Sequence, residues 1–186
     1  MMEGQPNPLL GWLKTNWVAP FNDANASWLL ETLARRCCLW LGEATAAAAW
    51  EWSGGHVMLL RLFGSVARAV AHRANPQQLV DAKTDRVLDR IIAAFVEHDA
   101  VQEICREVEQ LLAATAPDAA SLLWEIASSN ESSASIVERS GGRSSPAMRT
   151  LRNFGLVLED GDEIVVPGIW RWWSRFVTTT NIESAG

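Results

Sequence analysis

The segment from Ser144 to Trp173 constrains the fold of this chain more than any other stretch. Ser145 is a residue type that caps helix N-termini, Pro146 suits the first helical position, and Gly155 suits the position after the last turn. Two short apolar runs then flank Asp160-Gly161, a pair that favours a tight turn between antiparallel strands. The segment therefore predicts a short helix, a two-stranded hairpin and a closing helix, in that order.

Two further short helices are predicted before this segment. One carries apolar residues from Leu122 to Ala127, and the other spans residues 132–140 and ends at the turn Gly141-Gly142. Three short helices followed by a hairpin are the order of elements in a winged helix, which we predict for residues 117–177. In DNA-binding proteins of this kind, the last of the three helices enters the major groove. The basic residues in or beside that helix are candidate nucleic-acid contacts: Arg143, Arg149 and Arg152.

The charge of the predicted winged helix argues against DNA. Residues 118–177 hold six arginines and eight acidic residues, a net charge of −2. Four of the acids are at the tip of the hairpin: Glu159, Asp160, Asp162 and Glu163. Because DNA binding depends on cationic side chains that neutralise phosphates, this tip would repel the DNA backbone. We therefore expect the winged helix to dock onto protein, with DNA binding as the alternative.

The residues before the winged helix predict a mainly α chain. Residues 1–16 carry glycine, proline and asparagine with little periodicity and predict an extended N-terminal segment. Helical apolar spacing then continues through residues 17–116, and Ala116-Pro117 predicts a break between two lobes. Asp118 is the expected cap of the next helix. Residues 178–186 are expected to form a C-terminal tail.

Composition excludes several classes of protein. The chain of 186 residues has a formal net charge of −6, three cysteines and three histidines. Cys37, Cys38 and Cys105 have neither metal-ligand nor disulfide-framework spacing, so we expect no metal site and no cofactor. No apolar run is long enough to span a membrane, and the N-terminus lacks a signal pattern, so we expect a cytoplasmic protein without membrane association.

The sequence motifs that mark common catalytic sites are missing. The chain contains no G-x-x-x-x-G-K-[ST] phosphate-binding loop, no G-x-S-x-G and no H-E-x-x-H. The acids at the hairpin tip are expected to be solvated, which does not suit general acid–base catalysis. We predict that the chain by itself is not an enzyme.

Two phrases in the N-terminal part resemble the helical lid of a family of P-loop ATPases. They are Ala19-Pro20-Phe21-Asn22 and the segment from Trp50 to Arg61, which contains Ser53-Gly54-Gly55-His56. Both are similar to phrases in the lid of the AAA-like and signal-transduction (STAND) ATPases of prokaryotes, in which a winged helix commonly follows. The resemblance extends over residues 17–177 in order of elements. It implies a helical lid-like bundle followed by a winged-helix domain with one small β-hairpin.

This resemblance implies that Gly54, Gly55 and His56 face a nucleotide. The glycine pair and the following helix N-terminus, up to Val57, are expected to present free backbone N–H groups and a positive dipole end. A histidine in the first turn of a buried helix is more often a capping or core residue, which is the alternative for His56. The chain departs from the family at Val57, where the family has a proline, and its winged helix has no histidine. The P-loop half of such an ATPase is absent from this chain.

The resemblance and the missing motifs together predict a non-catalytic regulatory and protein-interaction module. Its expected partner is a P-loop ATPase domain or a second copy of the chain, and a DNA-binding transcriptional regulator is the alternative. The predicted partner interface is on the closing helix, because tryptophan is enriched at interface hot spots. Trp170 and Trp173 are three positions apart and share a helix face, whereas Trp172 is turned away from Trp170. We expect Trp172 either to pack on the helical lobe or to be exposed.

Overall fold

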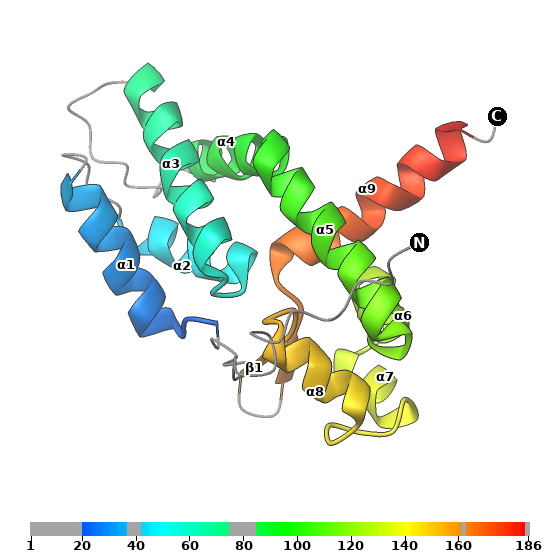
Figure 1. The fold of residues 1–186 in the computed structure, drawn as a ribbon. Helices are drawn as coiled ribbons and strands as arrows, with labels where there is room; N and C mark the ends of the chain where they lie inside the picture. The colour runs from blue at the N-terminus through cyan, green and yellow to red at the C-terminus, as the bar shows by residue number, and fades with distance from the viewer. Residues whose placement is uncertain (1–19, 37–41, 75–84, 161–162, 185–186) are drawn as a thin grey trace, which may run out of the picture.

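The structure, a computed structural model, describes residues 20–36, 42–74, 85–160 and 163–184. Over this part of the chain it has nine helices and one two-stranded antiparallel sheet, so the expectation of a mainly helical chain is confirmed. Figure 1 shows the first three helices grouped on one side of the molecule and the last elements of the chain on the other. The predicted extended segment lies outside the described residues.

Three helices form the N-terminal group: α1 (Asp23–Arg36), α2 (Glu43–Ser53) and α3 (Val57–Ala74). Asn22 caps α1, because its Oδ1 atom accepts a hydrogen bond from Asn25 N at 2.9 Å. The turn between α2 and α3 is made by Gly54 and Gly55, whose φ angles of 62° and 74° lie in the left-handed region. Each of the three helices packs on the other two.

The core of this group is built on the apolar face of α3, where Leu59, Leu60 and Phe63 are fully buried. The next helix, α4 (Asp85–Val96), packs across α3. The rings of Phe63 and Phe95 lie 5.2 Å apart at a tilt of 60°, a geometry that aromatic pairs favour. Spacing of three and four residues along each helix therefore places the apolar side chains on the contact face.

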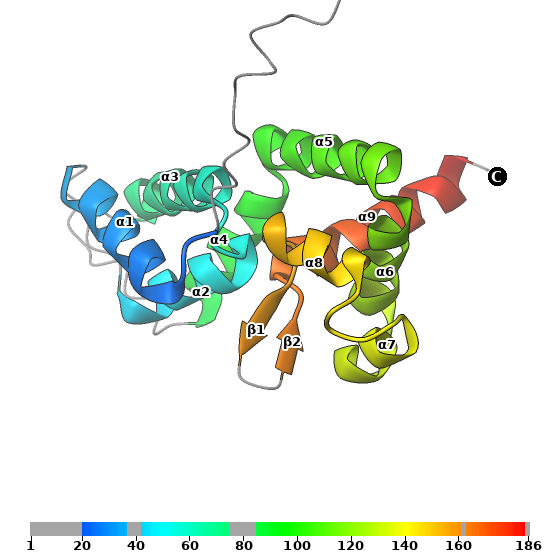
Figure 2. The ribbon, with the colours of Figure 1, turned by 60° about the horizontal axis from the view of Figure 1, so that its bottom comes forward.

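A single residue separates the next two helices, α5 (Asp99–Thr115) and α6 (Pro117–Ser128). Ala116 is the N-cap of α6 and Pro117 takes its first position. The expectation that Asp118 caps this helix is therefore wrong; Asp118 lies in the first turn, where a carboxylate favours the helix dipole. Because α5 contacts α4 before it and α6 after it, it connects the two groups of helices (Figure 2).

The C-terminal group continues with α7 (Ser133–Arg139), α8 (Pro146–Asn153), β1 (Leu158–Asp160), β2 (Glu163–Val165) and α9 (Gly168–Ser184). The start of α8 is as predicted, because Ser145 Oγ accepts a hydrogen bond from Met148 N at 3.3 Å. The hairpin is confirmed, with Glu159 opposite Ile164. Leu156 is not part of β1, because its N–H still donates to Leu151 O and closes α8. In Figure 2 the hairpin extends from α8 on the same side as α7.

The last helix, α9, joins the two groups of helices. It contacts α2 in the N-terminal group, and it also packs on α5 and α6. At the α2 contact, a Cβ atom on Gly168 would lie only 2.7 Å from Cδ2 of Trp52, so glycine lets the indole approach the backbone closely. The tail expected from residue 178 is helical as far as Ser184, which makes α9 longer than the sequence predicts.

Candidate functional site

The first candidate site is the turn of Gly54 and Gly55 before α3. Gly54 N donates to Trp50 O at 2.9 Å, and the N–H groups of Gly55 and His56 donate to the Oγ and carbonyl oxygens of Ser53 at 3.2 and 3.1 Å. The expectation that these three N–H groups are free is therefore wrong. A nucleotide contact at this turn stays a prediction. It is not supported by free backbone donors, because these three N–H groups bond within the turn.

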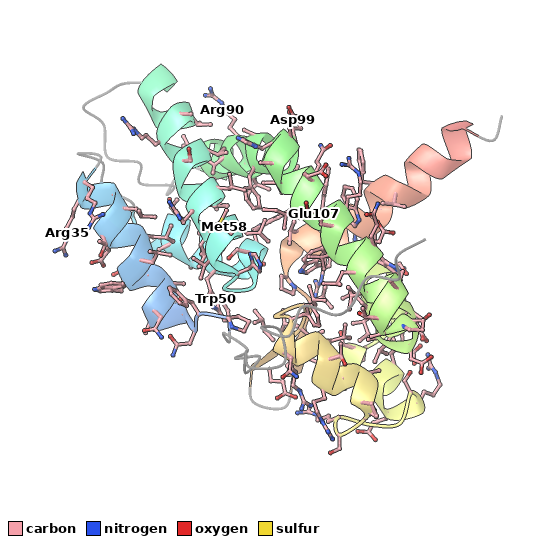
Figure 3. All side chains as sticks on the ribbon, in the orientation of Figure 1. Arg35, Trp50, Met58, Arg90, Asp99 and Glu107 are labelled. Atoms are coloured by element: carbon pink, nitrogen blue, oxygen red, sulfur yellow. The ribbon has the colours of Figure 1, made fainter. Side chains whose placement is uncertain are left out.

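The glycine pair has a structural role at this turn. A Cβ atom on Gly55 would lie 2.0 Å from Phe21 O, and one on Gly54 would lie 2.5 Å from Pro167 Cγ. Phe21 N donates to Gly55 O at 2.9 Å, and Trp50 Nε1 donates to Phe21 O at 3.1 Å. Figure 3 shows Trp50 near the N-terminal end of α1. The turn thus holds the chain before α1 and the chain before α9 in one junction.

His56 is half-buried at the start of α3. Its Nδ1 atom is buried and has no hydrogen-bond partner among the described residues. Burial disfavours the charged imidazolium and lowers the pKa of His56 below its ordinary value of 6.5. His56 is therefore a neutral imidazole at pH 7, and it does not supply a positive charge for a phosphate.

The second candidate site is the set of arginines in and beside α8. Arg149 is exposed on this helix, as DNA contact would require. Arg152 instead lies against the hairpin, with Nη2 at 2.8 Å from Glu159 Oε1 and at 2.6 Å from Arg143 O. The acidic hairpin and the candidate DNA-contacting helix are therefore joined by an ion pair, which the sequence did not predict.

The third candidate site is on α9. Trp170 and Trp173 share one helix face, as their spacing predicts, and are 2% and 3% exposed. Neither indole is therefore open to a partner, as membership of the predicted partner interface would require. Trp172 is half-buried and stacks on Phe176, with ring centroids 4.9 Å apart and planes at 19°. Phe176 also stacks on Trp173 at 5.4 Å and is itself 38% exposed. We call Trp172, Trp173 and Phe176 the α9 aromatic cluster.

Phe176 and Glu109 are members of this site that the sequence prediction missed. Phe176 follows Trp172 by four positions and Trp173 by three, and this helical spacing could have identified it. Glu109 on α5 accepts a hydrogen bond from Trp173 Nε1 at 3.0 Å across 64 positions of sequence, and no local signal marks that contact. The indole of Trp173 is thus fixed by a polar contact as well as by packing.

Metal and thiol chemistry find no support in the described residues. No three His, Cys, Asp or Glu side chains of this part of the chain are grouped so that they could hold a metal ion. Cys105 is fully buried, and burial together with the nearby Glu109 charge raises the pKa of its thiol to about 12, so it is not a nucleophile. Cys37 and Cys38 lie outside the described residues. None of the described helices has both the length and the apolar content needed to cross a membrane.

Known proteins provide no assignment for this chain. No protein-family model, curated protein or solved structure matches it significantly. The resemblance to P-loop ATPase lids therefore stays a prediction, and the function is argued from the residues and contacts described above.

Proposed function

We propose that this chain is a non-catalytic interaction module, made of a helical lid and a winged helix, that binds the nucleotide domain of a P-loop ATPase. The observation that carries the proposal is the α9 aromatic cluster. Trp172 is half-buried and Phe176 is 38% exposed, although both are large apolar side chains in an ordered stack. Exposed aromatic side chains on a fixed helix are typical of hot spots in protein interfaces.

The packing of the C-terminal group supports a winged helix. Its elements follow in the order α6, α7, α8, β1, β2 and α9. α6 packs on α7, α8 and α9, and α7 packs on β2. Three helices around one hairpin is the arrangement that a winged helix requires, and the cap at Ser145 and the left-handed Gly155 give α8 defined ends.

The junction at the glycine turn supports a lid that acts together with the winged helix. Gly54 lies against Pro167, and Gly155 lies against Pro20, where a Cβ atom would come within 2.3 Å of the proline Cγ. Each of these two contacts joins the N-terminal group to the C-terminal group. These contacts support a fixed arrangement of the lid and the winged helix.

The contacts of α8 favour protein over DNA as the partner. Arg152 is engaged by Glu159 of the hairpin, so its charge is already offset within the chain. Glu159 and Glu163 also put negative charge on the hairpin that would flank a DNA backbone. Arg149 is exposed and is the residue that favours the alternative, a DNA-binding regulator.

The proposal predicts that a P-loop ATPase chain is encoded beside this one in the genome, and that chain is the partner to test. We expect a Trp172→Ala, Phe176→Ala double variant to bind that chain at least about thirtyfold more weakly, because hot-spot side chains contribute 2 kcal/mol or more. Trp28→Ala is the matched control, since Trp28 is a 64% exposed tryptophan on α1, away from the cluster. Binding is measured by calorimetry, with circular dichroism to verify that each variant is folded.

Three results would contradict the proposal. The first is equal weakening by the Trp28→Ala variant and the double variant. The second is concentration-dependent dimerisation in sedimentation experiments that the double variant abolishes, which would make a second copy the occupant. The third is salt-dependent binding of duplex DNA in a gel-shift assay that Arg149→Ala abolishes, which would favour the DNA-binding alternative.

A further inference from the structure

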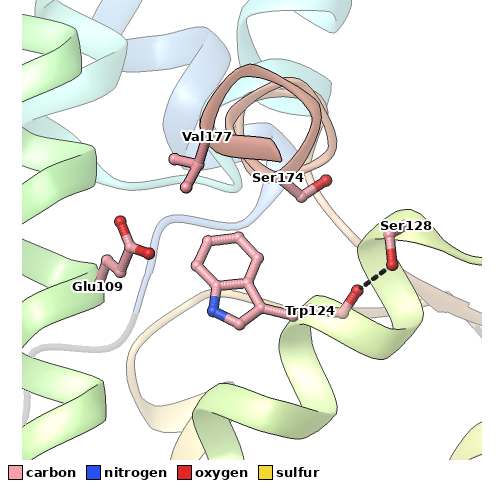
Figure 4. A pocket seen from close by; sticks show the side chains of 5 residues that line it. All are labelled: Glu109, Trp124, Ser128, Ser174 and Val177. Carbon is pink, nitrogen blue, oxygen red and sulfur yellow. Dashed lines mark hydrogen bonds between the residues drawn. The ribbon is translucent and has the colours of Figure 1, made fainter. Parts of the chain in front are cut away.

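A pocket of about 250 Å³ lies between α5, α6 and α9. Its described lining residues are Glu109, Trp124, Ser128, Ser174 and Val177. Figure 4 shows the indole of Trp124 between Glu109 on one side and the two serines on the other, with Val177 across from it. The pocket adjoins the α9 aromatic cluster through Glu109, which binds Trp173, but it belongs to neither the predicted nucleotide site nor the predicted DNA site.

Apart from the indole N–H of Trp124, the polar side-chain groups of this pocket offer hydrogen-bond acceptors. The Ser128 hydroxyl donates to Trp124 O at 2.6 Å, and the Ser174 hydroxyl donates to Arg171 O at 3.0 Å, so both protons are already committed. Glu109 accepts one hydrogen bond, from Trp173, through its Oε2 atom. A carboxylate has about four acceptor positions, so Glu109 retains capacity for a donor in the pocket. A ligand rich in donors would fit this arrangement.

The apolar groups of the pocket add a second requirement. Trp124 and Val177 are half-buried and provide an indole ring and an aliphatic side chain. An indole attracts a cation near its face, and aliphatic carbon packs well on both side chains. No lysine or arginine is among the described lining residues.

We propose that this pocket binds a primary ammonium or guanidinium group carried on a short aliphatic stem. The cationic head would lie against Glu109 and the Trp124 ring, and the stem along Val177. The volume is below the range of roughly 300–1,000 Å³ that drug-sized ligands occupy, which limits the ligand to a small amine or to one side chain. The same chemistry has two sources: a free alkylamine, or a lysine or arginine side chain of a partner protein.

The proposal is tested by titrating the full chain with pentan-1-amine and following the indole Nε1 resonances by ¹H–¹⁵N NMR. We expect saturable shifts of the Trp124 and Trp173 resonances, because one indole lines the pocket and the other binds Glu109. Pentan-1-ol and hexanoate carry the same five-carbon stem without the cation and are expected to give no saturable shift. Equal affinity for the alcohol and the amine would overturn the proposal.

Glu109→Gln isolates the charge, because the amide oxygen can still accept the Trp173 hydrogen bond. We expect this variant to raise the dissociation constant of the amine at least about tenfold, as loss of a charge-assisted hydrogen bond does. The matched control is Glu107→Gln on the same helix; Glu107 is exposed and does not line the pocket (Figure 3). Unchanged affinity in Glu109→Gln would overturn the proposal, as would a tenfold loss in the control.

The two sources are distinguished by titration with Nα-acetyl-lysine N-methylamide, which keeps the side-chain ammonium. Binding as tight as that of pentan-1-amine would assign the pocket to a side chain presented by a protein, since the blocked backbone imitates a polypeptide. Binding of the amine alone would assign it to a free small molecule. If the pocket binds a side chain of a protein, the identity of that protein rests on the proposed function. Neither titration includes the ATPase chain. Failure of the ATPase experiment and failure of this proposal are therefore separate results.

Discussion

Substitution of Gly55 by alanine tests the contact between the turn before α3 and the Phe21 segment, which precedes α1. Gly55 has a φ of 74°, and an added Cβ atom would lie 2.0 Å from the carbonyl oxygen of Phe21. This oxygen belongs to the backbone and also accepts the Trp50 Nε1 hydrogen bond, so it cannot move without loss of that contact. We expect Gly55→Ala to separate the Phe21 segment from the turn and to destabilise the whole junction.

Three terms contribute to the destabilisation. The left-handed conformation costs alanine about 1–2 kcal/mol. Overpacking against a fixed neighbour costs about 1–3 kcal/mol. Loss of the Phe21 N to Gly55 O hydrogen bond, which is 2.9 Å long, costs roughly 1 kcal/mol. The expected loss is therefore about 3–6 kcal/mol, a large part of the total stability of a typical domain.

The measurement is the free energy of unfolding in urea, followed by circular dichroism at 222 nm or by tryptophan fluorescence. Two glycines serve as matched controls. Gly141 has a φ of 97°, but its added Cβ atom would meet Ser145 Cβ at an ordinary 3.5 Å, so Gly141→Ala reports left-handed strain alone. Gly64 lies inside α3, where its added Cβ atom would meet Leu30 Cδ2 at 3.4 Å. We expect Gly64→Ala to change stability by less than about 1 kcal/mol in either direction.

A loss of stability in Gly55→Ala that is no larger than the loss in Gly141→Ala would contradict this prediction. That result would mean that left-handed strain explains the whole effect and that the approach of Phe21 imposes no constraint. A loss in Gly55→Ala that exceeds the Gly141→Ala loss by about 1 kcal/mol or more would support the junction.

Two further predictions concern buried titratable groups. Burial lowers the pKa of His56 in the folded chain below its ordinary value of 6.5. As the pH falls, the imidazole of the unfolded chain therefore binds a proton before that of the folded chain does. The free energy of unfolding is thus highest above pH 6.5 and declines below that pH. His56→Gln should flatten the decline in unfolding free energy between about pH 7 and about pH 5, and an unchanged slope would contradict the pKa shift. Because the pKa of the Cys105 thiol is raised to about 12, we expect it to resist alkylation by iodoacetamide at about pH 8 in the native chain and to react in urea. Mass spectrometry of the peptide that contains Cys105 measures the labelling. Rapid labelling of native Cys105 would show that this thiol is accessible.

Helix ends were the best predicted part of the fold, because the residues that fix them are close in sequence. Ser145 caps α8 through the N–H three positions later, as predicted. Gly155 is left-handed, as its place at the end of α8 predicted. The prediction that Asp118 caps α6 was wrong because Pro117 takes the first helical position, so that Ala116 is the N-cap.

The candidate sites were less predictable, because their main contacts are between distant residues. The sequence placed Gly54 and Gly55 directly before a helix N-terminus, but it did not identify Phe21 or Pro167 as the groups that occupy the space of their missing side chains. Helical spacing correctly separated Trp172 from the buried face. It carried no information on the contact between Trp173 and Glu109, because one-dimensional periodicity shows which face is buried and not what covers it.

The contact between Trp52 and Gly168 has a consequence for synthesis on the ribosome. Gly168 follows Trp52 by 116 positions. At elongation rates of about 5–20 residues per second, roughly 6–23 s pass between the two residues. During this interval the N-terminal helices can pack on one another, but the backbone that covers the Trp52 indole has not yet been made. The nascent chain thus presents an uncovered tryptophan to chaperones for longer than most small domains need to fold.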